Sequence, residues 1–259
     1  MKNSVVEDYR KRLVGQEFET INYGKCVIVE YESSRRITVK FYEPECLVTC
    51  EMGRLRRGKV RNPLTPNFYK KGYIGLGKYN GRDYKRSYVL WTSMLTRSYC
   101  KIYEKRQPRY KDVTVCEAWL NFQNFAAWCE TQEFFNDKDD KGKSYQLDKD
   151  ILVKGNKVYS PETCCFVPSY INSLVLSANR KRGVYPVGVH KRKNHFGASM
   201  SIEGSGSQNL GSFESPEEAF QVYKKAKENN IKCAAEKYKD FISHKLYEAL
   251  CKYEVEITD

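Results

Sequence analysis

Long apolar runs are missing from this sequence of 259 residues, and so is a leader-like start. No stretch reaches the roughly 20 consecutive apolar residues that a membrane-spanning helix requires. The opening Met1-Lys2-Asn3-Ser4 leads into no apolar signal-peptide core. These absences argue against a membrane protein, and we expect the chain to reside in the cytoplasm.

Paired cysteine motifs are absent as well. The ten cysteines include no Cys-x-x-Cys spacing. Without a secretory signal these residues should be reduced thiols and not a disulfide framework. A zinc site assembled from Cys100, Cys116 and Cys164 is conceivable, but buried free cysteine is a common small apolar side chain. We therefore favour buried thiols.

Acidic charge and histidine are in short supply. The sequence has 45 Lys and Arg against 32 Asp and Glu, a formal net charge of +13, and three histidines, His190, His195 and His244. A positive balance of this size favours a polyanionic partner, with nucleic acid the first candidate and an anionic membrane the second. An inert basic protein is the alternative on charge alone. Because 41% of the residues are hydrophobic, we expect a folded chain.

The first 63 residues read as a small β module. A short helix is predicted around Val5–Leu13, and alternating apolar positions predict strands at 26–31 and 36–41. The pattern is typical of a small barrel-like sheet and is similar to Src-homology-three-like modules. A basic run closes the module, either as a solvated edge or as a set of phosphate contacts. The run consists of Arg54, Arg56, Arg57, Lys59 and Arg61.

Residues 64–87 read as a basic and aromatic linker, because glycine and proline interrupt any periodicity there. Lys70 and Lys71 stand between tyrosines, so they could follow DNA phosphates. A loop packed by its own tyrosines is the alternative. Two helices with buried aromatic stripes are predicted next, one over 88–99 and one over 119–128.

The stretch 147–168 combines a short apolar run, two carboxylates, a turn and a helix signal. Asp148 and Asp150 flank Lys149, and a Gly155-Asn156 loop leads into strand-like Val158-Tyr159. Ser160-Pro161-Glu162 then predicts a helix start, with serine as N-cap and proline at the first helical position. Strand, loop, strand and helix in so short a span predict a scaffold that can hold a metal.

Residues 180–259 predict a three-stranded sheet followed by a helix. Strands are expected at 187–191, 196–202 and 209–213, a helix from Ser215 with a capping-box Glu218, and a final helix over 241–253. Between residues 180 and 213 there are six Lys or Arg against one acidic residue. Positive charge therefore lies on the sheet side, where strands could enter a DNA groove. The predicted DNA contacts are Arg180, Arg182, His190, Lys191, Arg192, Lys193 and His195.

The central motifs resemble the ββα-metal core of HNH endonucleases of phages and mobile elements. The resemblance rests on Leu-Asp-Lys at 147–149, Gly-Asn at 155–156 and Tyr-Ser-Pro-Glu-Thr-Cys at 159–164, and it extends back to residue 88. The last unit carries Gly-Val-His-Lys-Arg-Lys at 188–193 and Ala-Ser-Met-Ser-Ile at 198–202. Over about 188–238 it resembles the Apetala-two DNA-binding domain, which also occurs fused behind phage HNH nucleases. The fold implied is a multidomain α+β chain of modules 1–63, 64–87, 88–179 and 180–259. The setting implied is the cytoplasm of an infected or host bacterial cell.

The HNH resemblance implies a metal-dependent nuclease acting on double-stranded DNA. Its implied catalytic residues are Asp148, Lys149, Asp150 and Asn156, with Asp148 and Asp150 as ligands of Mg²⁺ or Mn²⁺. Two family positions differ here: Lys149 replaces the base histidine, and Thr163 replaces a metal-binding asparagine. Two functions stay open, a DNA endonuclease or nickase and a non-catalytic DNA-binding protein that regulates or inhibits a host factor. The two aspartates could also be merely solvated.

Overall fold

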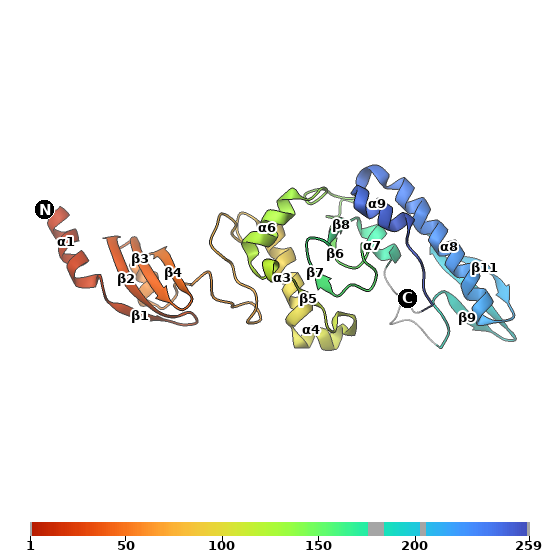
Figure 1. Ribbon diagram of the computed structural model, residues 1–259, viewed down its shortest axis with the longest axis horizontal. Coiled ribbons are helices and arrows are strands. Elements are labelled where there is room, and N and C mark those ends of the chain that lie inside the picture. The colour runs from red at the N-terminus through yellow and green to blue at the C-terminus, as the bar shows by residue number, and fades with distance from the viewer. Residues whose placement is uncertain (1, 176–183, 203–205, 258–259) are drawn as a thin grey trace. The chain divides into compact units, whose positions relative to one another are not determined.

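The computed structural model describes residues 2–175, 184–202 and 206–257 (Figure 1). The chain divides into two compact units, residues 1–127 and 128–259. The fold class is α+β, with a four-stranded antiparallel sheet first, a central region of helices and short strands next, and a three-stranded sheet with a long helix last. No helix among the described residues is long and apolar enough to span a membrane.

The first unit opens with helix α1 (Lys2–Leu13) and an antiparallel sheet in the order β1-β2-β3-β4. Its strands are β1 (Glu17–Thr20), β2 (Gly24–Ser33), β3 (Arg36–Tyr42) and β4 (Glu45–Cys50), followed by helix α2 (Met52–Arg56). The predicted helix and strands are confirmed. Ile37, Val39 and Phe41 alternate into the core, as period-two patterning requires.

The segment predicted as a linker, 64–87, has no helix or long strand before α3 begins at Lys85, but it packs on the helices that follow it. Those are α3 (Lys85–Tyr99), α4 (Lys101–Arg106), η1 (Pro108–Tyr110), α5 (Glu117–Leu120) and α6 (Phe122–Thr131), with strand β5 (Thr114–Val115) between them. The Gln123 amide group donates to the carbonyls of Ile74 and Tyr79 and accepts from the Tyr79 N–H. The segment is therefore held along its length.

One predicted helix is two in the structure. The aromatic stripe from Trp119 to Trp128 is shared between α5 and α6, because Asn121 has an extended backbone (φ −85°, ψ 118°). The Trp91 indole N–H donates to the Trp119 carbonyl at 2.7 Å. Trp91, Trp119 and Phe122 are fully buried, so the prediction that these stripes form the core is confirmed.

The second unit begins with strands β6 (Gln146–Asp148), β7 (Val158–Tyr159) and β8 (Cys165–Val167) and helix α7 (Ser169–Val175). The helix predicted from Ser160 is wrong. Residues 160–163 form a single turn in which the Cys164 N–H donates to the Ser160 carbonyl, and the chain then extends into β8, antiparallel to β6. The apolar residues Cys165–Val167 pair with β6 and are buried, so the helix begins after Pro168.

The unit ends with an antiparallel sheet in the order β11-β10-β9 and a long helix, α8 (Pro216–Lys237), that packs on it (Figure 1). The strands are β9 (Val189–Arg192), β10 (His195–Ile202) and β11 (Gly206–Phe213), and η2 (Lys239–Phe241) and α9 (His244–Cys251) follow α8. The prediction of three strands and a helix is confirmed. On α8, Phe220 is buried, whereas Val222 is 37% exposed.

One hydrophobic core joins α8 to β8 and α7. Val167 and Ile171 belong to the same buried cluster as Ala198, Phe220 and Ile231. The predicted module boundary between residues 179 and 180 lies outside the described residues. The strands, α7 and α8 are therefore parts of one packed unit.

Ser215 caps α8 as its sequence position predicts, since its hydroxyl accepts the Glu218 N–H at 3.2 Å. We expect Ser215→Ala to lower the free energy of unfolding by about 1 kcal/mol, because a backbone donor loses its partner. Urea unfolding followed by circular dichroism measures the change. Ser207→Ala, at an exposed position on β11, should change it by less than about 0.5 kcal/mol. Equal effects of the two substitutions would contradict the capping role.

Candidate active site and nucleic-acid interface

Asp148 is the last residue of β6 and turns the chain into the following loop. Its Oδ1 accepts the N–H groups of Asp150 and Ile151, both at 2.9 Å. Burial raises the pKa of the Asp148 carboxyl to about 6, the nearby charge of Asp150 adds to this, and the two backbone hydrogen bonds oppose it. This acid therefore changes its charge near neutral pH.

The raised pKa predicts how stability changes with pH. The fold favours the protonated carboxyl, so the charged form costs stability above pH about 6, and this cost disappears as the pH falls below the unfolded value near ~3.9. In metal-free buffer, Asp148→Asn should raise the free energy of unfolding at pH 8 by on the order of 1 kcal/mol and leave it unchanged at pH 4. Thermal melts at both pH values test this, with the exposed Asp137→Asn as control. Destabilisation at pH 8 would show that the charged carboxylate is needed by the fold.

Lys149, which stands where the resembled family has its base histidine, is buried and paired. It is 6% exposed, and its Nζ donates to Asp150 Oδ2 at 2.9 Å and to the Asn156 carbonyl at 3.1 Å. An ammonium held by a carboxylate has no lone pair with which to accept a proton. The same ion pair engages one oxygen of Asp150, whose side chain is 47% exposed. Asp150 is therefore a less available metal ligand than the sequence predicts.

Asn156 holds the loop that contains these groups. Its amide nitrogen donates to the carbonyls of Lys149 and Val158, each at 2.7 Å, and its oxygen accepts the Val158 N–H at 3.2 Å. These bonds tie the end of β6 to the start of β7. Asn156 therefore orients the loop between β6 and β7.

The sequence prediction places Thr163 on a helix, but the structure does not. Thr163 belongs to the turn before β8, where its hydroxyl donates to the Val158 carbonyl at 2.8 Å. The true helix, α7, carries Asn172, whose amide nitrogen donates to Gln146 Oε1 on β6. Gln146 and Asp148 are two residues apart on one strand, so they share a face of the sheet. A helix start predicted at Pro168-Ser169 would have placed Asn172 on the helix that packs on β6.

Asn172 has a buried oxygen without a partner. Within the part of the chain that the structure describes, its Oδ1 is one of the few buried side-chain atoms that form no hydrogen bond. Such atoms are rare in folded proteins and commonly mark a missing ion or water. Sequence reasoning missed this residue because its environment depends on where α7 begins.

Asp148, on β6, and Asn172, which is hydrogen-bonded to β6, each offer one oxygen ligand. Carboxylate and amide oxygens are ligands that Mg²⁺ and Mn²⁺ prefer. In Mg²⁺ sites, water and substrate phosphate commonly supply the remaining ligands. Across the described ranges, no cluster of three or more His, Cys, Asp and Glu residues could hold a metal. This finding gives no support to the zinc alternative at Cys100, Cys116 and Cys164. Burial raises the pKa of the Cys164 thiol to about 12, as expected for an inert buried thiol.

The last sheet has an open face that carries polar and small residues. His195 pairs with Arg192, and Gly197 pairs with His190, so these side chains share the face opposite the buried Ala198. The Arg192 Nε donates to His190 Nε2 at 3.2 Å. Lys191 pairs with Phe196 and points to the other side, and Lys193 lies in the two-residue turn. Arg180 and Arg182 lie outside the described residues.

The remaining predicted DNA contacts are exposed residues of the first unit. Arg54 and Arg56 lie on α2, Arg57 follows it, and Lys70 and Lys71 lie in the tight turn between Phe68 and Gly72. Their role as phosphate contacts stays a prediction. No protein-family model, no curated protein and no solved structure matches this chain.

Proposed function

We propose that this protein is a DNA endonuclease or nickase that hydrolyses phosphodiester bonds with Mg²⁺ or Mn²⁺. The proposed centre is the antiparallel strand pair β6 and β8 with α7, an arrangement that supports the resemblance to a ββα-metal core. The observation that carries the proposal is the Asn172 Oδ1, which has no hydrogen-bond partner. The nitrogen of the same amide donates to Gln146, on the face of β6 that also bears Asp148. The Asn172 Oδ1 and a carboxylate oxygen of Asp148 would hold the cation.

The chain's own groups have distinct roles in this proposal. Asp148 offers the carboxylate, fixed by two backbone donors, and Asn156 keeps the loop closed. The bound cation would stabilise charge on the leaving 3′ oxygen and lower the pKa of bound water. Lys149, as an ammonium, balances the charge of Asp150 and accepts no proton. The open face of β9–β11 and the net charge of +13 would hold the duplex.

A second candidate function is a DNA-binding protein without catalysis, which regulates or inhibits a host factor. The Lys149–Asp150 ion pair favours it, because this pair occupies the place of the family's base. Both candidates share the DNA interface and differ only at β6.

Cation binding tests the proposed centre before any cleavage is measured. Mn²⁺ should raise the melting temperature of the wild-type chain, and Asp148→Asn and Asn172→Ala should each remove most of the increase. Asp137→Asn, in an exposed turn, should keep it. An equal Mn²⁺ response in all four proteins would remove Asp148 and Asn172 from the cation site.

A further inference from the structure

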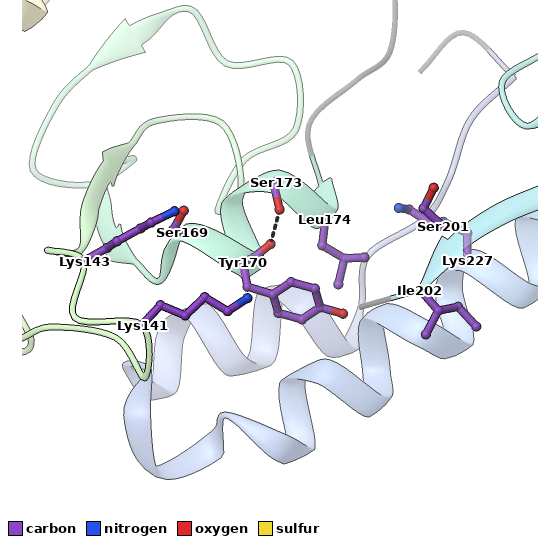
Figure 2. A pocket seen from close by; sticks show the side chains of 9 residues that line it. All are labelled: Lys141, Lys143, Ser169, Tyr170, Ser173, Leu174, Ser201, Ile202 and Lys227. Carbon is purple, nitrogen blue, oxygen red and sulfur yellow. Dashed lines mark hydrogen bonds between the residues drawn. The ribbon is translucent and has the colours of Figure 1, made fainter. Parts of the chain in front are cut away.

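A cavity of about 370 Å³ lies in the second unit, apart from the residues proposed for catalysis. Its wall is built from the turn at 139–143, helix α7, the end of β10 and the middle of α8. Figure 2 shows the Tyr170 ring in the middle, with Lys141 and Lys143 on one side and Lys227 and Ser201 on the other. None of the described residues that line it is acidic.

Lys227 is the most buried of the three lysines at this cavity. It is half-buried on α8, and burial lowers the pKa of its ammonium. Among the described residues its Nζ has no ion pair or hydrogen bond, whereas Lys224, one turn earlier, pairs with Glu228 at 3.2 Å. A partly buried ammonium without a counter-ion costs stability, so its position calls for an anion from outside the chain.

The other two lysines concentrate positive charge at the same cavity. Lys141 and Lys143 are exposed and leave a turn that Asp139 fixes, since its Oδ1 accepts the N–H groups of both residues, at 3.1 and 2.8 Å. The Ser173 hydroxyl donates to the Tyr170 carbonyl, so it is committed within α7. The lining therefore brings three ammonium groups and the hydroxyls of Ser169 and Ser201 to one cavity.

We propose that this cavity binds phosphate groups, carried by a nucleic-acid backbone or by a free polyphosphate. Ammonium groups on both sides of an aromatic ring match a ligand with more than one oxyanion, and lysine acts on phosphate as a point charge. The inference goes beyond cleavage, because it requires neither Asp148 nor a metal.

The test begins with metal-free thermal melts of the full chain in inorganic pyrophosphate, against chloride of equal ionic strength. Pyrophosphate should raise the melting temperature of the wild type. Lys227→Met should melt higher than wild type without the anion, because a buried charge is gone, yet lose most of the pyrophosphate response. The double variant Lys141→Gln/Lys143→Gln, both exposed positions, should also lose it, and exposed Lys225→Gln should keep it.

DNA titrations at several salt concentrations distinguish the two sources of phosphate. If backbone phosphates occupy the cavity, the slope of log K against log salt should fall by about one for each lysine removed. If the ligand is a free polyphosphate, that slope stays as in the wild type while the pyrophosphate response is lost. The proposal is overturned if both the melting response and the DNA slope of the pocket variants equal those of Lys225→Gln. Should Lys227→Met fail to fold, the exposed double variant decides alone.

Discussion

Asp148→Asn should reduce metal-dependent DNA cleavage by a factor of about 10²–10⁴, the range typical for losing a group that acts directly on the reaction. The amide is nearly the same size and keeps an oxygen that can accept the Asp150 and Ile151 N–H groups. The loop should therefore stay in place while the charge that attracts the cation is lost. The measurement is the initial rate of nicking of supercoiled plasmid with Mn²⁺.

Two comparisons make this result specific to the active site. DNA affinity of Asp148→Asn, measured without metal, should stay within a few-fold of the wild type, because the predicted DNA contacts lie on other elements. Asp137→Asn should cleave at the wild-type rate. Equal cleavage by wild type and Asp148→Asn would exclude Asp148 from the mechanism.

Arg192→Ala should weaken binding to a preferred duplex by about 1–3 kcal/mol and binding to random DNA far less. Arg192 lies on the open face of β9, where its planar guanidinium can bind guanine through two bonds. Lys191 points to the opposite side and can contribute only charge, so Lys191→Ala should weaken both duplexes nearly equally. Competition binding of the full chain, after selection of a preferred site, measures the ratio.

A second outcome would contradict the role of Arg192 in reading the DNA sequence. If Arg192→Ala and Lys191→Ala lower specific and random binding in the same proportion, the sheet is only an electrostatic clamp. The hydrogen bond from Arg192 to His190 also predicts that His190→Ala weakens the preference less than Arg192→Ala does.

The elements with strict periodicity could be predicted from sequence. One face of β3 is buried, and its residues Ile37, Val39 and Phe41 alternate with polar ones in the sequence. Ser215 predicts the start of α8 because its hydroxyl accepts a hydrogen bond from the first turn of that helix. The Ser160 prediction was wrong because a local cap signal competed with the pairing and burial of Cys165–Val167 against β6, and tertiary pairing prevailed. Aromatic spacing likewise gave no sign of the break at Asn121.

The site was predictable where residues act through the local chain. Asp148 and Asn156 bond to backbone groups within seven residues, so their loop roles follow from the motif. The burial of Lys149 and the unpartnered oxygen of Asn172 depend on packing between β6, the loop and α7. The spacing of residues in the sequence does not predict this packing. It does not predict the position of Lys227 at the cavity either.

Plasmid cleavage by the wild-type chain tests the central claim most directly. Supercoiled plasmid incubated with the protein and Mn²⁺ or Mg²⁺ should yield nicked or linear DNA, and chelation by EDTA should prevent it. Gel retardation in the same buffer shows whether the DNA is bound. If the plasmid is retarded but stays supercoiled with either metal, the proposed nuclease activity is contradicted. The second candidate, a DNA-binding protein without catalysis, would then be favoured.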